Sequence, residues 1–215
     1  MKQSNMAEPD GRLEMKFIGI TGGVGAGKSE ILSYLKKQQN SRVMLADEIA
    51  HELMEPGTAC YQTIKDHFPG EDIYLPGGGF DRVKLAAVIF ADEEKRTQMN
   101  AIVHPAVKEY VKEVWEQEQK KGVLDFLFLE AALLIEEHYD EICNELWYIY
   151  TREDIRRQRL IASRGYSEEK IRQIFDSQLS EEEYRSHCSL VLDNNGSVEE
   201  TITQLKEALG NRKKK

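Results

Sequence analysis

The sequence contains very little cysteine. Its three cysteines among 215 residues, Cys60, Cys143 and Cys188, are odd in number and widely separated, and none belongs to a C-x-x-C pair. A disulfide framework needs paired cysteines, and a zinc site needs closely spaced ligands. We therefore expect neither, and we expect reduced, partly buried thiols in a cytoplasmic protein.

Long hydrophobic runs are also missing. No apolar stretch approaches the ~20 residues that a membrane-spanning helix needs. Residues 1–14 (MKQSNMAEPDGRLE) lack the apolar segment that defines a signal peptide. The sequence thus predicts no membrane partner, and we expect residues 1–14 to be a disordered extension.

Positive charge is not in excess. The 29 Lys and Arg residues stand against 38 Asp and Glu residues, which gives a net charge of −9. Because nucleic-acid-binding domains usually carry a basic surface that displaces counterions, we expect no nucleic-acid partner. The end of the chain, residues 210–215 with Arg212, Lys213, Lys214 and Lys215, is predicted to be a solvated basic tail. We expect a monomer, although the sequence leaves oligomerisation open.

The most informative stretch covers residues 17–29 (FIGITGGVGAGKS). An apolar segment leads into a glycine-rich turn and then into residues with helical spacing. The turn fits the pattern G-x-x-x-x-G-K-[ST], with Gly22, Gly27, Lys28 and Ser29 at the required places. A glycine-rich turn without a ligand is the alternative, but the strand, loop and helix order favours a phosphate-binding loop.

Such a loop holds a polyphosphate through its backbone N–H groups and the N-terminus of the following helix. Lys28 is expected to reach the β- and γ-phosphates of ATP, and the Ser29 hydroxyl is expected to bind Mg²⁺. The residues predicted to bind the nucleotide are Gly22, Gly23, Val24, Gly25, Ala26, Gly27, Lys28, Ser29 and Glu30.

Asp47 follows a predicted second strand, residues 42–46. Ligands of parallel sheets gather at the carboxyl ends of the strands, so we expect Asp47 beside the phosphate loop. There it could orient or deprotonate an attacking hydroxyl, as a carboxylate does in kinases. Equally, it could be the N-cap of a helix over residues 48–54. Position alone leaves both interpretations open.

A long helical passage, residues about 58–121, predicts an insertion between strands. Such an insertion can cover the strand ends and bind the second substrate, so that binding energy orders the acceptor against the donor. His104 precedes Pro105, and proline is favoured as the first residue of a helix. We therefore expect one helix to end near residue 103 and another to begin at Pro105.

Residues 123–129 (VLDFLFL) are nearly all apolar, as a parallel strand buried on both faces should be. Glu130 follows this predicted third strand, where an acid can hold Mg²⁺ or its water. Residues 145–150 predict a fourth strand and residues 189–192 a fifth. The acidic residues between the third and fourth strands are expected to form a solvated face: Glu136, Glu137, Asp140 and Glu141.

Residues 151–165 carry an unusual density of arginine for an acidic protein. Guanidinium groups bind phosphoryl oxygens bidentately, so we expect one or two of these arginines to act in a lid, residues about 152–185. The alternative is that they pair with Glu153 and Asp154 on an exposed helix. The arginines are Arg152, Arg156, Arg157, Arg159 and Arg164.

Taken together, these elements predict an α/β protein with the three-layer P-loop NTPase fold, in which residues 15–209 form one kinase domain around a five-stranded parallel sheet. Serines that suit helix N-caps, Ser167, Ser180 and Ser197, predict the helices of the last third of the chain.

Several segments carry a family resemblance over about residues 16–209. They are GITGGVGAGKS, ADEIAHELMEPGT, FDRVKLAAVIFADEEKRTQMNAIVHPAV, RLIASRGYSEE and LVLDNNGS. The first is common to many P-loop proteins, and the second, third and last are far more particular. In this order they resemble the dephospho-coenzyme A kinase family. The resemblance implies transfer of the ATP γ-phosphate to the ribose 3′-hydroxyl of dephospho-coenzyme A, with Mg²⁺, as the final step of coenzyme A synthesis.

Residue by residue, the resemblance implies that Asp47 is the catalytic base and binds the acceptor, that His104 contacts the acceptor, and that Arg159 acts with Lys28 in catalysis. The chain departs from the family pattern at four positions, Leu45, Ala132, Arg164 and Ile174.

Two other functions stay open. A kinase of another small acceptor, such as a nucleoside monophosphate, would share the loop and the lid but should lack the HELMEPGT and AIVHPAV segments. A non-catalytic relative would bind ATP without turnover, and the departures at Leu45 and Ala132, together with the altered lid, slightly favour it.

Overall fold

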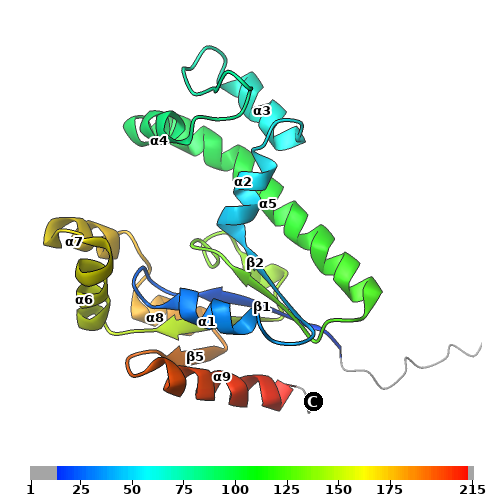
Figure 1. The fold of residues 1–215 in the computed structure, drawn as a ribbon, viewed down its shortest axis with the longest axis vertical. Coiled ribbons are helices and arrows are strands. Elements are labelled where there is room, and N and C mark those ends of the chain that lie inside the picture. Colours follow the sequence, from blue (N-terminus) through cyan, green and yellow to red (C-terminus); the bar gives the residue numbers. More distant parts are fainter. Residues whose placement is uncertain (1–13, 213–215) are drawn as a thin grey trace, which may run out of the picture.

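The computed structural model describes residues 14–212, and its centre is a parallel sheet with the strand order β2-β3-β1-β4-β5 (Figure 1). The predicted five-stranded α/β fold is confirmed. The expectations for residues 1–13 and 213–215 lie outside the described residues. The strands are β1 (Lys16–Thr21), β2 (Ser41–Leu45), β3 (Phe126–Glu130), β4 (Glu145–Tyr150) and β5 (Leu190–Asp193).

Helices cover both faces of the sheet, which is why its inner strands are apolar on both sides. On one face, α1 (Lys28–Leu35) and α9 (Val198–Arg212) bury a cluster that includes Ile18 and Phe128. On the other face, Trp115 of α5 (Glu93–Lys121) stacks on Phe17 of β1, with ring centroids 5.2 Å apart. Adjacent strand residues therefore belong to opposite cores.

Four helices lie between β2 and β3. They are α2 (Ala46–Leu53), α3 (Ala59–His67), α4 (Arg82–Ala91) and α5. Of these, α3 and α4 rise above the sheet as a lobe, and α5 runs from this lobe down beside the sheet (Figure 1). The lobe shares one continuous core with the α5 face of the sheet, because Ile64 and Leu85 belong to the same buried cluster as Phe17.

The predicted break before Pro105 is wrong, because α5 runs without interruption from Glu93 to Lys121 with Pro105 inside it. A proline inside a helix costs about 3 kcal/mol. Each fully buried apolar side chain returns roughly 1.5–3 kcal/mol, and one buried stripe spans the proline. Tertiary packing therefore outweighs the local signal. The stripe consists of Met99, Val103, Val107, Val111 and Val114.

Two element boundaries near the strand ends also differ from expectation. Helix α2 begins at Ala46, its N-cap is Leu45, and no side chain caps it. The N-cap interpretation of Asp47 is therefore wrong, and its carboxylate lies in the first turn of α2. Glu130 is the last residue of β3 instead of following it, because it pairs in register with Ile20 and Leu45.

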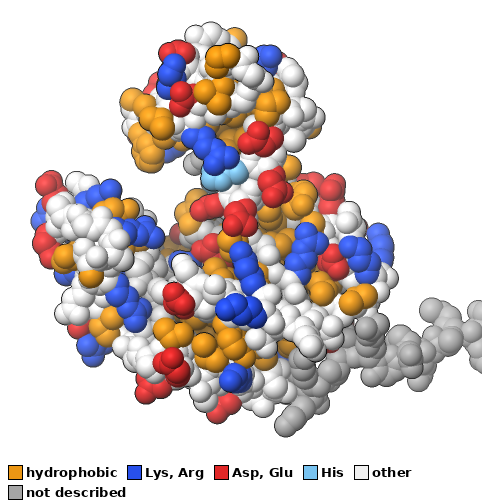
Figure 2. Space-filling model, viewed as in Figure 1, with side chains coloured by type: hydrophobic (Ala, Val, Ile, Leu, Met, Phe, Trp, Pro, Cys, Tyr) orange, Lys and Arg blue, Asp and Glu red, His pale blue; other side chains and the backbone are white. Residues whose placement is uncertain are grey.

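The arginine-rich segment forms an arm of two helices, α6 (Glu153–Arg164) and α7 (Glu168–Asp176), followed by α8 (Glu181–His187). Ser167 and Ser180 cap α7 and α8 as predicted. Tyr184 of α8 stacks on Tyr148 of β4 with ring centroids 4.7 Å apart. Figure 2 shows a hollow between this arm and the lobe that contains α3 and α4.

The structure bears on the expectations of free thiols and of no membrane-spanning helix. Cys60, Cys143 and Cys188 are all free thiols, the first two buried. Across residues 14–212, no helix combines the length and the apolarity that crossing a bilayer requires.

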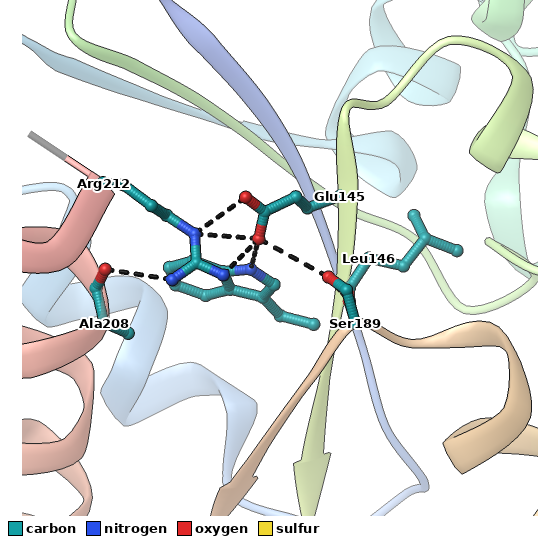
Figure 3. Close-up of polar contacts among 6 residues, drawn as sticks. Glu145, Leu146, Ser189, Ala208 and Arg212 are labelled. Atoms are coloured by element: carbon teal, nitrogen blue, oxygen red, sulfur yellow. Dashed lines mark hydrogen bonds and ion pairs between the residues drawn. The ribbon is translucent and has the colours of Figure 1, made fainter. Parts of the chain in front are cut away.

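The Arg212 side chain is only 19% exposed, which corrects the expectation for the first charged residue of the basic tail. Its Nε lies 2.8 Å from both carboxylate oxygens of Glu145, and its Nη1 donates to the Ala208 carbonyl (Figure 3). The Trp147 indole donates to Glu145 at 2.9 Å and lies under the guanidinium group. This network fastens the end of α9 to the start of β4.

Replacing Arg212 with alanine is expected to lower the free energy of unfolding by about 2 kcal/mol, because a half-buried carboxylate loses its charged hydrogen-bond donor. Burial alone would raise the pKa of Glu145, but bonds from Arg212 and Trp147 outweigh it and lower the pKa. The stabilisation is therefore present at neutral pH and disappears as pH falls through that lowered pKa. Urea unfolding at about pH 7 and about pH 3 measures both effects.

Lys120→Ala is the matched control. Lys120 pairs with Glu116 at 3.8 Å on the exposed side of α5, and such pairs contribute about 0.5 kcal/mol or less. Equal losses in the two variants would contradict a fastening role for Arg212.

Candidate functional site

The glycine-rich loop connects β1 to α1 at the carboxyl edge of the sheet. Gly27 is the N-cap of α1 in the left-handed region, with φ of 85°. A Cβ there would lie 2.4 Å from Nδ2 of Asn194, so only glycine fits. No side chain caps α1, which leaves the N–H groups of its first turn to an anion.

Lys28 lies at the mouth of this loop. Its Nζ donates to the Gly22 carbonyl at 2.5 Å and lies 3.7 Å from Oε1 of Glu130. Burial lowers the pKa of Lys28, and the Glu130 carboxylate opposes that shift. Burial in turn raises the pKa of Glu130, while Lys28 lowers it and Asp47 raises it. The charge of Asp47 thus reaches both members of the pair, as strand ends on one edge predict.

Asp47 also borders a pocket of about 160 Å³ between α2, α5 and the segment that follows β3. His104, Glu137 and Tyr139 are its other ionisable residues, and Nδ1 of His104 lies 2.6 Å from Oε1 of Glu137. The structure therefore brings the two predicted acceptor residues, Asp47 and His104, into one pocket. Its remaining walls are apolar: Ala46, Ala50, Val103, Val107, Ala131, Ala132 and Leu133.

The acidic run after β3 is not simply a solvated face. Glu137 holds His104, and Glu141 lies 3.3 Å from Nζ of Lys108. Lys108 also donates to the backbone carbonyl of His138. The expectation is therefore corrected for Glu137, which fastens this segment to α5, whereas Glu136, Asp140 and Glu141 are exposed as expected.

The arginines in and beside α6 differ in orientation: some pair with acidic residues on the surface, and others face the phosphate loop. Arg152 pairs with Asp154 at 2.9 Å, and Arg157 pairs with Glu153 at 2.8 Å. For these two, the prediction of ion pairs on an exposed helix is confirmed. At the end of α6, Cζ of Arg164 lies 5.8 Å from the ring centroid of Tyr166.

Arg159 faces the phosphate loop. Its Nη2 donates to the Asn194 carbonyl at 2.9 Å, and its Nη1 lies 3.4 Å from the Ala26 carbonyl. Nδ2 of the buried Asn194 donates to that same carbonyl at 2.7 Å. Asn194 is not among the residues predicted for the site, because no local signal marks its contact with a loop 168 positions away.

Arg156 also faces the loop, although the family resemblance implied a catalytic role only for Arg159. Its Nε donates to the Val24 carbonyl at 2.9 Å, and its Nη2 donates to Oε1 of Gln178. A signal for its orientation exists in the sequence. Arg156, Arg159 and Leu160 share one face of a helix, and Leu160 is the buried residue of α6.

Oxygen atoms that could hold Mg²⁺ lie at the same edge. Ser29 is the second residue of α1, and the carboxylates of Glu130 and Asp47 are close enough to influence each other. Within residues 14–212, no three His, Cys, Asp or Glu residues form a metal cage. A hydroxyl with one or two carboxylates, completed by phosphates and water, is the set that suits Mg²⁺.

Comparisons with known proteins give one answer. The family model for dephospho-CoA kinase (CoaE) matches residues 16–200. A dephospho-CoA kinase from Shouchella clausii is 35% identical over 192 residues, which cover 89% of this chain and 96% of that protein. One from Oceanobacillus iheyensis is 38% identical over 192 residues, 89% of this chain and 95% of that protein.

Solved structures extend the comparison to the fold. TT1252 from Thermus thermophilus superposes with a TM-score of 0.74 at 29% identity, covering 92% of this chain and 98% of that one. A shikimate kinase from Acinetobacter baumannii shares the fold alone, with a TM-score of 0.55 at 14% identity over 92% of this chain and 94% of that one. The family model and the relatives, taken with the phosphate loop, show that this chain belongs to the dephospho-CoA kinase family.

Proposed function

We propose that the protein transfers the γ-phosphate of ATP to the ribose 3′-hydroxyl of dephospho-CoA, giving CoA and ADP in the final step of CoA synthesis. Family membership over residues 16–200 supports the reaction. The observation that carries it to this chain is the position of Lys28, which lies in the phosphate loop and within electrostatic reach of Asp47 in the adjoining pocket.

The donor is assigned to the phosphate loop. Residues 22–30 surround the phosphates with backbone N–H groups, and Lys28 meets the charge of the β- and γ-phosphates. Arg159, which reaches the carbonyl of Ala26, adds positive charge beside the end of the loop. Ser29 is the proposed ligand of Mg²⁺, with Glu130 acting through water. Held there with the phosphates, the ion would neutralise charge that develops during transfer.

The acceptor is assigned to the pocket between α2 and α5. Asp47 accepts the proton of the 3′-hydroxyl, or orients it, as the oxygen attacks the γ-phosphate. Glu137 holds the His104 ring in one orientation, so that its other nitrogen is placed toward the acceptor. The apolar walls exclude water from the attacking oxygen and so limit hydrolysis of ATP.

The larger divisions of the chain take matching roles. We assign residues about 58–121 to acceptor binding and residues about 152–185 to a lid that closes over the transferring group. We further propose that the protein acts as a monomer in the cytoplasm. Closure of the lid would narrow the hollow between the lid and the acceptor-binding division (Figure 2).

Release of ADP with a panel of acceptors tests the function. With dephospho-CoA, kcat/KM is expected to exceed that with AMP, CMP or shikimate by about 100-fold or more, because a site built around one hydroxyl rejects acceptors that cannot place it. Equal rates with a nucleoside monophosphate would assign the protein another acceptor. Binding of ATP without turnover of any acceptor would make it a non-catalytic relative.

A further inference from the structure

Gln178 lies in the loop between α7 and α8, and its side chain reaches the tip of the phosphate loop. Its Oε1 accepts a hydrogen bond from the backbone N–H of Val24 at 3.3 Å and a second bond from Nη2 of Arg156. One amide oxygen thus joins the phosphate loop to the helical arm.

Arg156 completes the contact from the other side of the same loop residue. Its Nε donates to the carbonyl of Val24 at 2.9 Å, so the N–H and the C=O of Val24 are both held by the segment α6–α8. The ring of Phe175 lies against the guanidinium group, 4.3 Å from Cζ to the ring centroid. The head of Arg156 is therefore fixed on three sides before any ligand binds.

Gly23 shows how closely Arg156 approaches the loop. A Cβ on Gly23 would lie 2.4 Å from both Cζ and Nη2 of Arg156. Any side chain here would displace the guanidinium group. The glycine is therefore needed both for the turn and for the close packing of Arg156 on the loop.

Within residues 14–212, no ion pair neutralises the charge of Arg156, and Glu153 acts on it only from beyond ion-pair distance. In the part of the chain that the structure describes, no carboxylate pairs with Arg156, whereas Arg157 beside it has two. Nη1 donates to none of the described residues, and no fully buried side-chain nitrogen among them lacks a partner, so Nη1 is not fully buried. A fixed guanidinium group beside loop N–H groups is suited to a phosphate oxygen.

We propose that Gln178 is a positioning residue for the phosphoryl donor, which holds Arg156 and the Val24 peptide group in the arrangement that receives ATP. The inference rests on the proposed function, because it takes ATP as the donor. A neutral amide suits this role, because its oxygen accepts both bonds and leaves the charge of Arg156 intact, whereas a carboxylate would cancel that charge.

Gln178→Ala removes the shared acceptor and is expected to raise the Kd of ATP about tenfold, the value of one hydrogen bond to a charged group. The KM of dephospho-CoA should stay within about twofold. Calorimetric titration with ATP in the absence of acceptor measures the first effect, and steady-state rates measure the second. The matched control is Gln173→Ala, an exposed glutamine of α7, for which the Kd of ATP should not change.

Gln178→Glu separates positioning from simple structural support. The carboxylate keeps both hydrogen bonds and pairs with Arg156, so the Tm should be kept or raised, while the cancelled charge raises the Kd of ATP about tenfold or more. If this variant binds ATP as the wild type does, the proposal is overturned.

A double-mutant cycle then tests whether Gln178 acts through Arg156. In an Arg156→Ala background, Gln178→Ala should raise the Kd of ATP by less than about threefold, because the group it positions is gone. A full tenfold effect in that background, or an unchanged Kd in the single variant, would overturn the inference. Failure of the wild type to bind ATP would instead refute the proposed function, so the two failures are distinguishable.

Discussion

Replacing Lys28 with methionine is expected to lower kcat/KM about 1,000-fold or more. Loss of a single preorganised donor to developing charge costs roughly 10²–10³-fold, and the Lys28 side chain, only 17% exposed, acts where charges interact more strongly than in water. Because the same charge meets the phosphates of bound ATP, the KM of ATP should rise as well. Initial rates of ADP release over a range of both substrates measure the two effects.

The methionine keeps the apolar stem of Lys28 and removes only the charged end. Its neighbour Glu130 then loses a cation, and since burial already raises the pKa of that carboxyl group, we expect it to protonate more readily instead of destabilising the fold. The thermal midpoint should therefore change little. The control is Lys36→Ala, at the exposed end of α1, which should keep the rate of the wild type. If the Lys28 variant releases ADP as fast as this control, the assignment of the ATP donor to the phosphate loop is refuted.

The phosphate loop was predictable because its signal is local. Gly22, Gly27, Lys28 and Ser29 stand within eight consecutive positions, and an apolar strand before them and a helix after them leave one way to fold the segment. The placement of Asp47 followed from a topological rule, since parallel strands end at one edge of the sheet. Both predictions needed only the neighbouring residues and the order of the strands.

The structure differs from the sequence-based expectation where distant residues decide the outcome. Pro105 stays inside α5 because a buried stripe spans it, and Arg212 leaves solvent because Glu145 lies against the end of α9. No window of the sequence contains both partners of such a contact. Local propensity therefore predicted a break in the first case and a free tail in the second.

The arginines show the same limit within a single helix. Composition indicated that the segment binds phosphate or pairs with acids; the ion pairs are confirmed for two arginines, and phosphate binding stays a prediction. Arg152 and Arg157 face acidic neighbours on the surface, whereas Arg156 and Arg159 face the loop. The choice depends on which side of α6 packs against the core, which the buried Leu160 decides.

Asp47→Asn is expected to lower kcat about 100- to 1,000-fold, within the range that a general base contributes, while the KM of ATP stays within about twofold. The amide has the shape of the carboxylate but can neither take a proton from the 3′-hydroxyl nor orient it through a negative charge. Because Asp47 caps no helix, its replacement removes no structural hydrogen bond, so the thermal midpoint should be unchanged. Steady-state kinetics with both substrates varied give the separate effects on kcat and on each KM.

The control is Glu48→Gln, which makes the same chemical change at the next residue of α2, also exposed. If Asp47 is the base, only the Asp47 variant loses turnover. A raised KM of dephospho-CoA with unchanged kcat would instead show that Asp47 binds the acceptor equally in the ground state and the transition state. In that case the proton must leave by another route, and the His104–Glu137 pair in the same pocket, with its 2.6 Å contact, would be the next group to replace.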